Sequence, residues 1–153
     1  MKVLVDTNVL VRLANPADAN QSTELNALAA VAAAGHRPCL VPQVIYEYWV
    51  VATRPVDKNG LGHSIEMAER DLAQFDADFE LLPDTAVILP AWRQVVIHRR
   101  VIGKLAHDAR LVAAMIRHNV THLMTFNAPD FKRFSEIETL DPGAAAMGNI
   151  ASL

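Results

Sequence analysis

Acidic side chains at four separate places in the chain have the type and position to carry chemistry. Asp6 follows a short run of strand-forming residues, whereas Glu47 and Asp108 each lie in an apolar, helix-like stretch. Asp130, with Asn127 just before it, follows a later apolar run. Carboxylate oxygens are the ligands that Mg²⁺ and Mn²⁺ prefer, and Mg²⁺ takes one or two of them together with water and phosphate. If these side chains meet, the pattern predicts metal-assisted hydrolysis of a phosphodiester.

Each of these acids also has an ordinary structural explanation. Asp6 stands where an aspartate commonly caps a helix. Glu47 lies on an apolar helix face, where a carboxylate needs a partner or a cation, and a salt bridge to Arg54 would serve as well as a metal. Asp108 is placed to interact with a helix dipole, and the two later residues are common in turns. Convergence of the four positions is therefore the feature that favours a site.

Other catalytic patterns are missing from the sequence. Gly103 and Lys104 lack the upstream glycine of a P-loop, and no GxGxxG or GxSxG motif occurs. The six histidines form no HExxH motif, which argues against a zinc site. The absence of these patterns argues against nucleotide-driven chemistry and against a covalent hydrolase.

The cellular setting follows from the single cysteine and the apolar runs. Cys39 cannot form an internal disulfide, and Asp6 interrupts any apolar signal-peptide core. The uninterrupted apolar stretches are far shorter than a membrane span. We therefore expect a cytoplasmic protein that does not enter a membrane.

Charge is distributed unevenly in this chain of 153 residues with a net charge of −3. Up to residue 90 there are six Lys and Arg against twelve Asp and Glu, and from residue 91 there are eight against five. Arg99, Arg100 and Lys104 belong to the basic stretch and are candidate contacts to phosphate groups. An ordinary solvated helix surface explains them equally well.

Strand-like runs alternate with helix-like stretches along the chain. We expect strands at 2–5, 39–41, 79–82, 122–125 and 137–140, and helices at 22–34, 43–54, 63–75, 85–99 and 105–118. This alternation predicts an α/β/α sandwich with a central, mainly parallel sheet of about five strands. Ligands of such sheets gather beyond the carboxyl ends of the strands. We divide the chain into one domain, 1–142, and a loosely attached C-terminal tail, 143–153.

The acidic segments resemble those of a known family, the PIN domain, and within it the VapC-type toxins. The resemblance rests on Val5–Leu10, Val44–Trp49 with Ala52–Pro55, His107–Leu111, and Met124–Asn127 with Pro129–Phe131, in this order. It implies that residues 1–142 form a PIN-like nuclease domain in which Asp6, Glu47 and Asp108 are the main catalytic, metal-binding acids. Many relatives carry a further acid in the last segment. Here Asn127 takes the nearer place, so Asp130 supplies the fourth carboxylate or a second metal is held weakly.

The resemblance also implies an activity. It indicates an endoribonuclease that uses one or two Mg²⁺ or Mn²⁺ ions to cut RNA, the toxin of a type II toxin–antitoxin pair. Thr7, Thr125 and Asn127 would orient ligands or water from behind the acids. A small VapB-like antitoxin and a second copy of the chain are the implied partners. Tyr46, Trp49 and Phe75 either line the groove for that antitoxin or belong to the core.

Two different readings of the acids compete with this one. A receiver-like signalling domain also gathers acids and Mg²⁺ at a sheet edge, but it needs an acceptor aspartate after a central strand and a lysine after a later one. Neither 79–84 nor 122–125 supplies that set. A non-catalytic PIN-like scaffold, whose acids only brace helices, is the second alternative.

Overall fold

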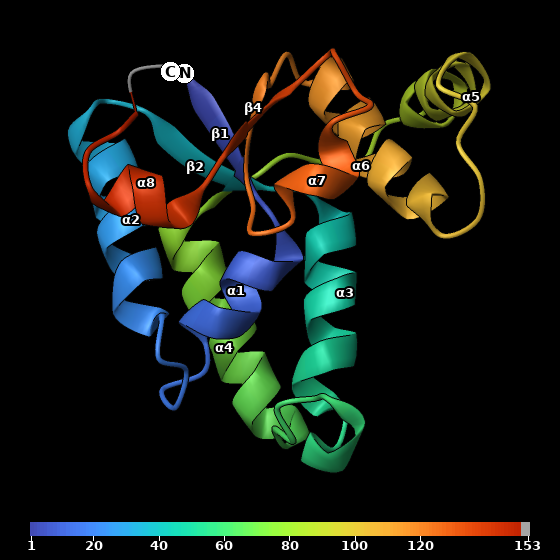
Figure 1. The fold of residues 1–153 in the computed structure, drawn as a ribbon. Helices are drawn as coiled ribbons and strands as arrows, with labels where there is room; N and C mark the ends of the chain where they lie inside the picture. Colours follow the sequence, from blue (N-terminus) through green and yellow to red (C-terminus); the bar gives the residue numbers. More distant parts are fainter. Residues whose placement is uncertain (151–153) are drawn as a thin grey trace.

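The computed structural model describes residues 1–150 (Figure 1). At its centre, five strands form one sheet in the order β3–β2–β1–β4–β5, and every neighbouring pair is parallel. The strands are β1 Lys2–Val5, β2 Arg37–Leu40, β3 Glu80–Leu81, β4 His122–Met124 and β5 Glu138–Leu140. Val3, Leu4 and Val5 of the central strand are wholly buried. An uninterrupted apolar run is what a strand covered on both faces requires.

Helices connect the strands and form two groups by contact. They are α1 Thr7–Leu13, α2 Gln21–Ala33, α3 Pro42–Thr53, α4 Ile65–Asp78, α5 Ile88–His98, α6 Leu105–Arg117, α7 Ala128–Phe131 and α8 Pro142–Ala146, with a 3₁₀ turn η1 Val56–Lys58. One group contains α1, α2, α3, α4 and α8, and the other contains α5, α6 and α7. In Figure 1, α2 and α8 lie on the left of the sheet and α5 and α6 on the right.

The strand order explains this division. From β1 the chain moves outward to β2 and β3, and it then crosses back to β4 and β5 on the other side of β1. Right-handed crossovers place the helices of these two directions on opposite faces of the sheet. The order reverses between β1 and β4, and ligands of open parallel sheets bind at such a switch point, beyond the carboxyl ends of the strands. Asp6 directly follows β1, and Thr125 directly follows β4.

The predicted fold class is confirmed, and the element limits differ from the predicted ones by a few residues. The second strand begins at Arg37 instead of Cys39 because it pairs with β1 from Lys2 onward. The helix expected at 85–99 begins only at Ile88, which places Pro90 in its first turn. Backbone N–H groups there have no intrahelical acceptor, so a proline costs no hydrogen bond.

The end of the chain corrects one expectation. Residues 143–153 were expected to form a loosely attached tail, yet α8 packs against α2 and Ala145 is wholly buried. Asp141 caps this helix by accepting a hydrogen bond from the Ala144 backbone N–H at 2.9 Å. Residues 151–153 of the expected tail lie outside the described residues. The domain boundary at residue 142 stays a prediction.

No helix within residues 1–150 is both long enough and apolar enough to cross a membrane.

Candidate active site

Asp6 is held at the switch point by groups from two strand ends. It is the N-cap of α1, and its Oδ1 accepts a 2.7 Å hydrogen bond from the Thr7 backbone N–H. Its Oδ2 accepts hydrogen bonds from the Thr125 hydroxyl at 2.6 Å and from the Asn8 side-chain amide at 2.8 Å. Burial nevertheless raises the pKa of Asp6, because desolvation outweighs these donors. Asp6 is thus both the helix cap and a candidate ligand, the two roles that the sequence left open.

Glu47 reaches the same place from α3. Its Oε2 accepts a 2.8 Å hydrogen bond from the Thr7 hydroxyl, and its Oε1 accepts one of 2.8 Å from the Gln43 amide. The Gln43 amide also donates to the backbone carbonyl of His107 at 2.9 Å. Arg54, the alternative partner expected from the sequence, is not among these contacts. The amide of Gln43 therefore ties the Glu47 carboxylate to the first turn of α6.

Asp108 stands in that first turn of α6 and is half-buried. Its pKa is raised to about 6, first by desolvation and then by the negative charges of Asp130, Asp6 and Glu47. When the negative charges of several other acids raise the pKa of a carboxyl group, those acids lie close to it and nearby cations do not neutralise them. The three main acids predicted from the sequence therefore come together in space.

Asp130 and Asn127 lie at the outer side of this group. Asp130 is exposed in the short helix α7, and the Asn127 side-chain amide donates to its Oδ2 at 2.8 Å. The backbone N–H of Asn127 donates to the Thr125 hydroxyl at 2.9 Å. This loop thus joins the fourth acid to the threonine that supports Asp6.

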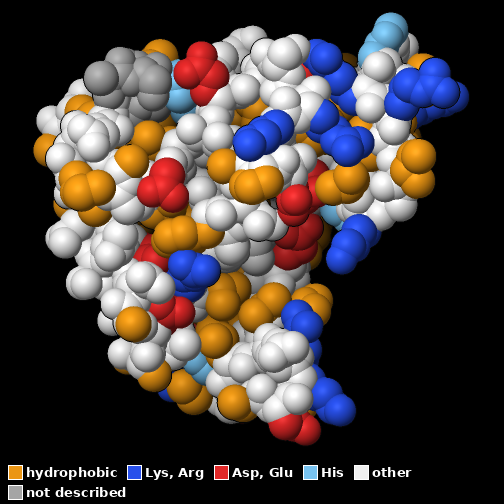
Figure 2. Space-filling view, in the orientation of Figure 1, with side chains coloured by type: hydrophobic (Ala, Val, Ile, Leu, Met, Phe, Trp, Pro, Cys, Tyr) orange, Lys and Arg blue, Asp and Glu red, His pale blue; other side chains and the backbone are white. Residues whose placement is uncertain are grey.

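Two adjoining cavities contain the four acids. The larger, of about 510 Å³, is lined by Asp6, Glu47 and Asp108, and the other, of about 420 Å³, by Glu47, Asp108 and Asp130. Figure 2 shows the molecule deeply hollowed on one side, with acidic side chains at the inner end of the hollow and Lys and Arg side chains around it. The last turns of α3 and the α3–α4 connection also border the larger cavity, through Val51 and Leu61 respectively.

The donor set suits a hard divalent cation, although it is open. Within residues 1–150, no three acidic, histidine or cysteine side chains are grouped tightly enough to form a ready-made metal site. Mg²⁺ does not require such a cage, since one or two carboxylates, water and a substrate phosphate complete its shell. The raised pKa values of Asp6 and Asp108 point the same way, because a cation would offset the repulsion among these carboxylates.

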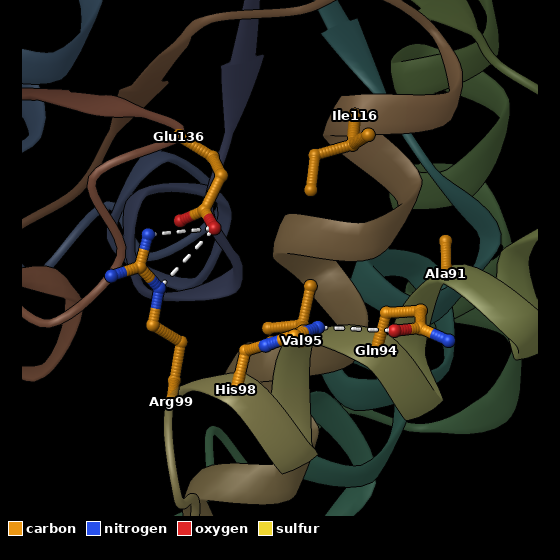
Figure 3. Close-up of a pocket in the computed structure, with 7 residues that line it drawn as sticks. All are labelled: Ala91, Gln94, Val95, His98, Arg99, Ile116 and Glu136. Carbon is orange, nitrogen blue, oxygen red and sulfur yellow. Dashed lines mark hydrogen bonds and ion pairs between the residues drawn. The ribbon is translucent and has the colours of Figure 1, made fainter.

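The three predicted basic contacts lie in different places. Lys104 lines the smaller acidic cavity. Arg99 instead lines a separate cavity between α5 and α6, where its guanidinium donates to Glu136 Oε1 at 2.8 Å (Figure 3). Arg100, with a positive φ of 50°, is exposed just after α5. Of the three, Lys104 is therefore the one that the structure brings to the acids.

Comparison with known proteins identifies the family of this chain. The family model described as PIN domain matches residues 3–137. The chain belongs to the PIN domain family. No curated protein matches the chain at a significant level.

Solved structures share the PIN fold of this chain at low sequence identity. A chain of VapBC2 from Rickettsia felis, bound to a DNA fragment from its promoter, has a TM-score of 0.68 and 20% identity, with 92% of this chain and 100% of that chain covered. VapBC-1 from nontypeable Haemophilus influenzae has a TM-score of 0.66 and 16% identity, with 93% and 98% covered. VapC20 from Mycobacterium tuberculosis, a toxin that cleaves the sarcin–ricin loop, has a TM-score of 0.60 and 21% identity, with 84% and 92% covered.

Two polar residues of this PIN domain site were not predicted as site residues. Asn8 joins the two strand ends, because its side chain donates to Asp6 and accepts from the Phe126 backbone N–H at 3.2 Å. Gln43 precedes Glu47 by one helical turn, so the two side chains share a helix face. That spacing was the available signal for Gln43, whereas the partner of Asn8 in the loop after β4 could not be read from the sequence.

Proposed function

We propose that this chain is a Mg²⁺- or Mn²⁺-dependent endoribonuclease that hydrolyses RNA phosphodiester bonds. The observation that supports this most is the meeting of Asp6, Glu47 and Asp108, from three different elements, in one open cavity at the switch point of a PIN domain. Within residues 1–150 none of these three acids forms a salt bridge, and the pKa of Asp108 is raised to about 6.

The side chains of this site have distinct tasks in the proposal. Asp6 is oriented by Thr125 and Asn8, and Glu47 by Thr7 and Gln43, so both carboxylates are preorganised. Asp108 and Asp130 complete the acidic wall from the other side of the cavity. A bound divalent cation would lower the pKa of a water molecule and neutralise charge on the phosphoryl oxygens. The open cavity leaves room for the phosphodiester between the acids and solvent.

The test is RNA cleavage by purified protein. Wild type, Asp6→Asn and Asp108→Asn are compared on structured and unstructured RNAs, with Mg²⁺, with Mn²⁺ and with EDTA. Asp76→Asn is the matched control because Asp76 is exposed on α4, outside the residues that line the acidic cavities. We expect metal-dependent cuts by wild type and the control, and at least a 100-fold loss in the site variants, the size that loss of a preorganised charged group produces. No cleavage by folded, metal-loaded wild type would favour the non-catalytic scaffold.

We further propose that the chain is the toxin of a toxin–antitoxin pair, acts in the cytoplasm and is held inactive by a small VapB-like antitoxin. The support is that similar structures come from VapBC complexes at TM-scores of 0.66 and 0.68. Of the aromatic residues expected at a docking groove, Tyr46 is 64% exposed, whereas Phe75 belongs to the core.

Growth of a bacterial host tests the toxin role. Induced wild type is expected to arrest growth, and Asp6→Asn, expressed at the same soluble level, is expected not to. Equal growth with both proteins would remove the toxin role and leave the nuclease proposal to the cleavage assay.

A further inference from the structure

Arg12 is a basic residue inside the acidic cavity. It lies in the last turn of α1 and lines the 510 Å³ cavity together with Asp6, Glu47 and Asp108. Among the cavity-lining residues in the described part of the chain, 1–150, Arg12 is the one with a positive charge, and Asp18 adds a further acid. An anionic ligand that enters the cavity would therefore be attracted to the positive charge of Arg12.

The guanidinium of Arg12 is placed by an aromatic ring. Its Cζ atom lies 3.8 Å from the centroid of the Phe126 ring, in the loop that follows β4. A cation over the face of an aromatic ring is attracted by the ring's quadrupole. Such a contact uses the face of the guanidinium and leaves its N–H donors, which lie at the edge of the guanidinium plane, available. The stack therefore fixes the group without using its hydrogen bonds.

Those donors are not taken by the acids nearby. Within residues 1–150, the Arg12 guanidinium makes neither an ion pair nor a hydrogen bond to another side chain. Glu24 on α2 is wholly buried with both carboxylate oxygens unpaired, and it is close enough for Arg12 to lower its pKa against the effect of burial. Arg12 thus lies against Phe126 and lines the cavity, although the unpaired carboxylate of Glu24 is nearby.

We infer that Arg12, backed by Phe126, binds a phosphate of the RNA strand beside the phosphate that is cleaved. The inference rests on the proposed function, because that function supplies the polyanion and places its reacting phosphate at the acids. A planar guanidinium suits a phosphate because two parallel N–H donors can bind two oxygens at once. Arg12 is therefore a binding and positioning residue, and Asp6 and Glu47 remain the groups nearest the chemistry.

The first test measures binding without cleavage. Anisotropy of a fluorescein-labelled single-stranded RNA is titrated with protein in EDTA over a range of KCl concentrations. Each phosphate contact contributes about −0.7 to the slope of log K against log salt concentration for a single strand. We expect Arg12→Ala to bind roughly tenfold more weakly and to reduce that slope by about 0.7.

Two further variants separate the charge of Arg12 from its geometry. Arg12→Lys keeps the charge but loses the planar fork, so the slope should return while part of the affinity stays lost. Phe126→Leu should weaken binding through the loss of the stack. Arg37→Ala is the matched control, since Arg37 is exposed at the amino end of β2, the opposite edge of the sheet, and it should behave as wild type.

The outcomes distinguish this inference from the proposed function. If RNA binds and the slope of Arg12→Ala equals that of Arg37→Ala, the inference is wrong and the nuclease proposal stands. If wild type cuts no RNA but Arg12→Ala still lowers the slope, Arg12 binds an RNA phosphate as inferred, while the nuclease proposal and the placement beside a cleaved phosphate fail. Failure of wild type to bind any RNA in EDTA overturns the inference and leaves the nuclease proposal to the cleavage assay with Mg²⁺ or Mn²⁺.

A purely structural role for Arg12 has its own signature. If Arg12→Ala lowers Tm, Glu24→Gln restores Tm in the double variant, and RNA binding is unchanged throughout, Arg12 serves as the counter-ion of Glu24 and the inference is overturned. Should Arg12→Ala fail to fold, the same decision is made with Arg12→Lys and Phe126→Leu.

Discussion

At the scale of single residues, the site depends on polar groups that hold carboxylates where the protein interior disfavours them. The Asp6 side chain is almost fully buried, and three donors surround it, of which the Thr125 hydroxyl is the closest. Thr125 is itself wholly buried and also accepts a hydrogen bond from the Asn127 backbone N–H. Its hydroxyl therefore links two strand ends as well as supporting the acid.

Replacing Thr125 with valine tests this link. The change keeps the shape of the side chain but leaves the Asn127 N–H and Asp6 Oδ2 each without one partner. A buried polar group without a partner costs about 1–3 kcal/mol, so the free energy of unfolding should fall by about that much. Urea denaturation measures it, and Thr139→Val, at an exposed position of β5, should stay within about 0.5 kcal/mol of wild type. Equal stability of the two variants would show that Thr125 does not support Asp6.

Asp108 predicts a dependence of stability on pH in the metal-free protein. The usual pKa of an aspartate side chain is 3.8, and that of Asp108 in the folded chain is about 6. Between pH 3.8 and pH 6, the folded state therefore keeps a proton that the unfolded state has released. The contribution of Asp108 to the free energy of unfolding therefore decreases as pH rises through this window and stays reduced above it.

Asp108→Asn should remove this penalty. In EDTA at pH 7.5, we expect its Tm to exceed that of wild type by up to about 2–4 °C, the shift that roughly 1 kcal/mol gives in a chain of this size. The partial exposure of Asp108 limits the gain. At pH 3.5, where Asp108 is protonated in wild type, the difference should shrink. Asp76→Asn serves as the control, and a Tm below wild type at pH 7.5 would contradict the assignment.

At the scale of elements, α3 and α4 form a hairpin that carries Glu47 and walls the cavity. Their packing encloses a buried polar group, in which the Tyr48 hydroxyl donates to Asp71 Oδ2 at 2.6 Å and His63 Nδ1 lies 2.9 Å from the same oxygen. Tyr48 also meets Phe75 edge to face, with ring centroids 4.8 Å apart. Glu47 and Tyr48 are adjacent on α3. The contacts of Tyr48 with α4 therefore fix the rotation of α3 about its axis, which directs the Glu47 side chain toward Thr7.

Tyr48→Phe tests the hairpin. It keeps the ring contact and removes a hydrogen bond to a carboxylate, which should lower the free energy of unfolding by about 1.5–3 kcal/mol. Tyr46→Phe is a control on the same helix, since Tyr46 is 64% exposed and should change stability by less than about 0.5 kcal/mol. Chemical denaturation of both variants measures the difference. If they prove equally stable, the buried hydroxyl does not join α3 to α4.

At the scale of the whole molecule, the sheet holds both halves of the site in one rigid unit. Strands β1 and β4 are neighbours although most of the chain lies between them, and both strands are buried along almost their whole length. Cys39 on β2 is wholly buried at this centre, and its thiol donates to the Val3 carbonyl at 3.4 Å. Desolvation raises the pKa of this thiol to about 12.

The reactivity of Cys39 therefore reports on opening of the whole domain. The thiolate is the reactive form, so a buried thiol of such high pKa should not react with a disulfide reagent at pH 8. We expect labelling only when urea unfolds the chain, with a midpoint equal to that measured by circular dichroism. Cys39 is the single cysteine of the sequence, which makes the signal unambiguous. Fast labelling of the native protein, at a rate near that of free glutathione, would show that the sheet centre opens locally.

Much of this architecture was readable from local patterns. Alternating strand and helix signals predicted the parallel sheet of about five strands, because apolar periodicity is a local property of the chain. The positions of Asp6 after β1 and of Asp108 in the first turn of α6 were predicted in the same way. The start of the helix near Pro90 and the packing of α8 were not predicted, since both depend on neighbours that are distant in sequence.

The sequence by itself determined which residues are able to do chemistry, because residue type and spacing set the charge, the helix faces and the strand ends. Only the tertiary structure decided which of them meet. Strand order brings Thr125 to Asp6, helix packing brings Gln43 to Glu47, and α1 carries Arg12 onto Phe126. The tertiary structure also places Arg99 away from the acids, where it binds Glu136. The physical reason is that hydrogen bonds and ring contacts act over a few ångströms in space, and chain folding alone sets those distances.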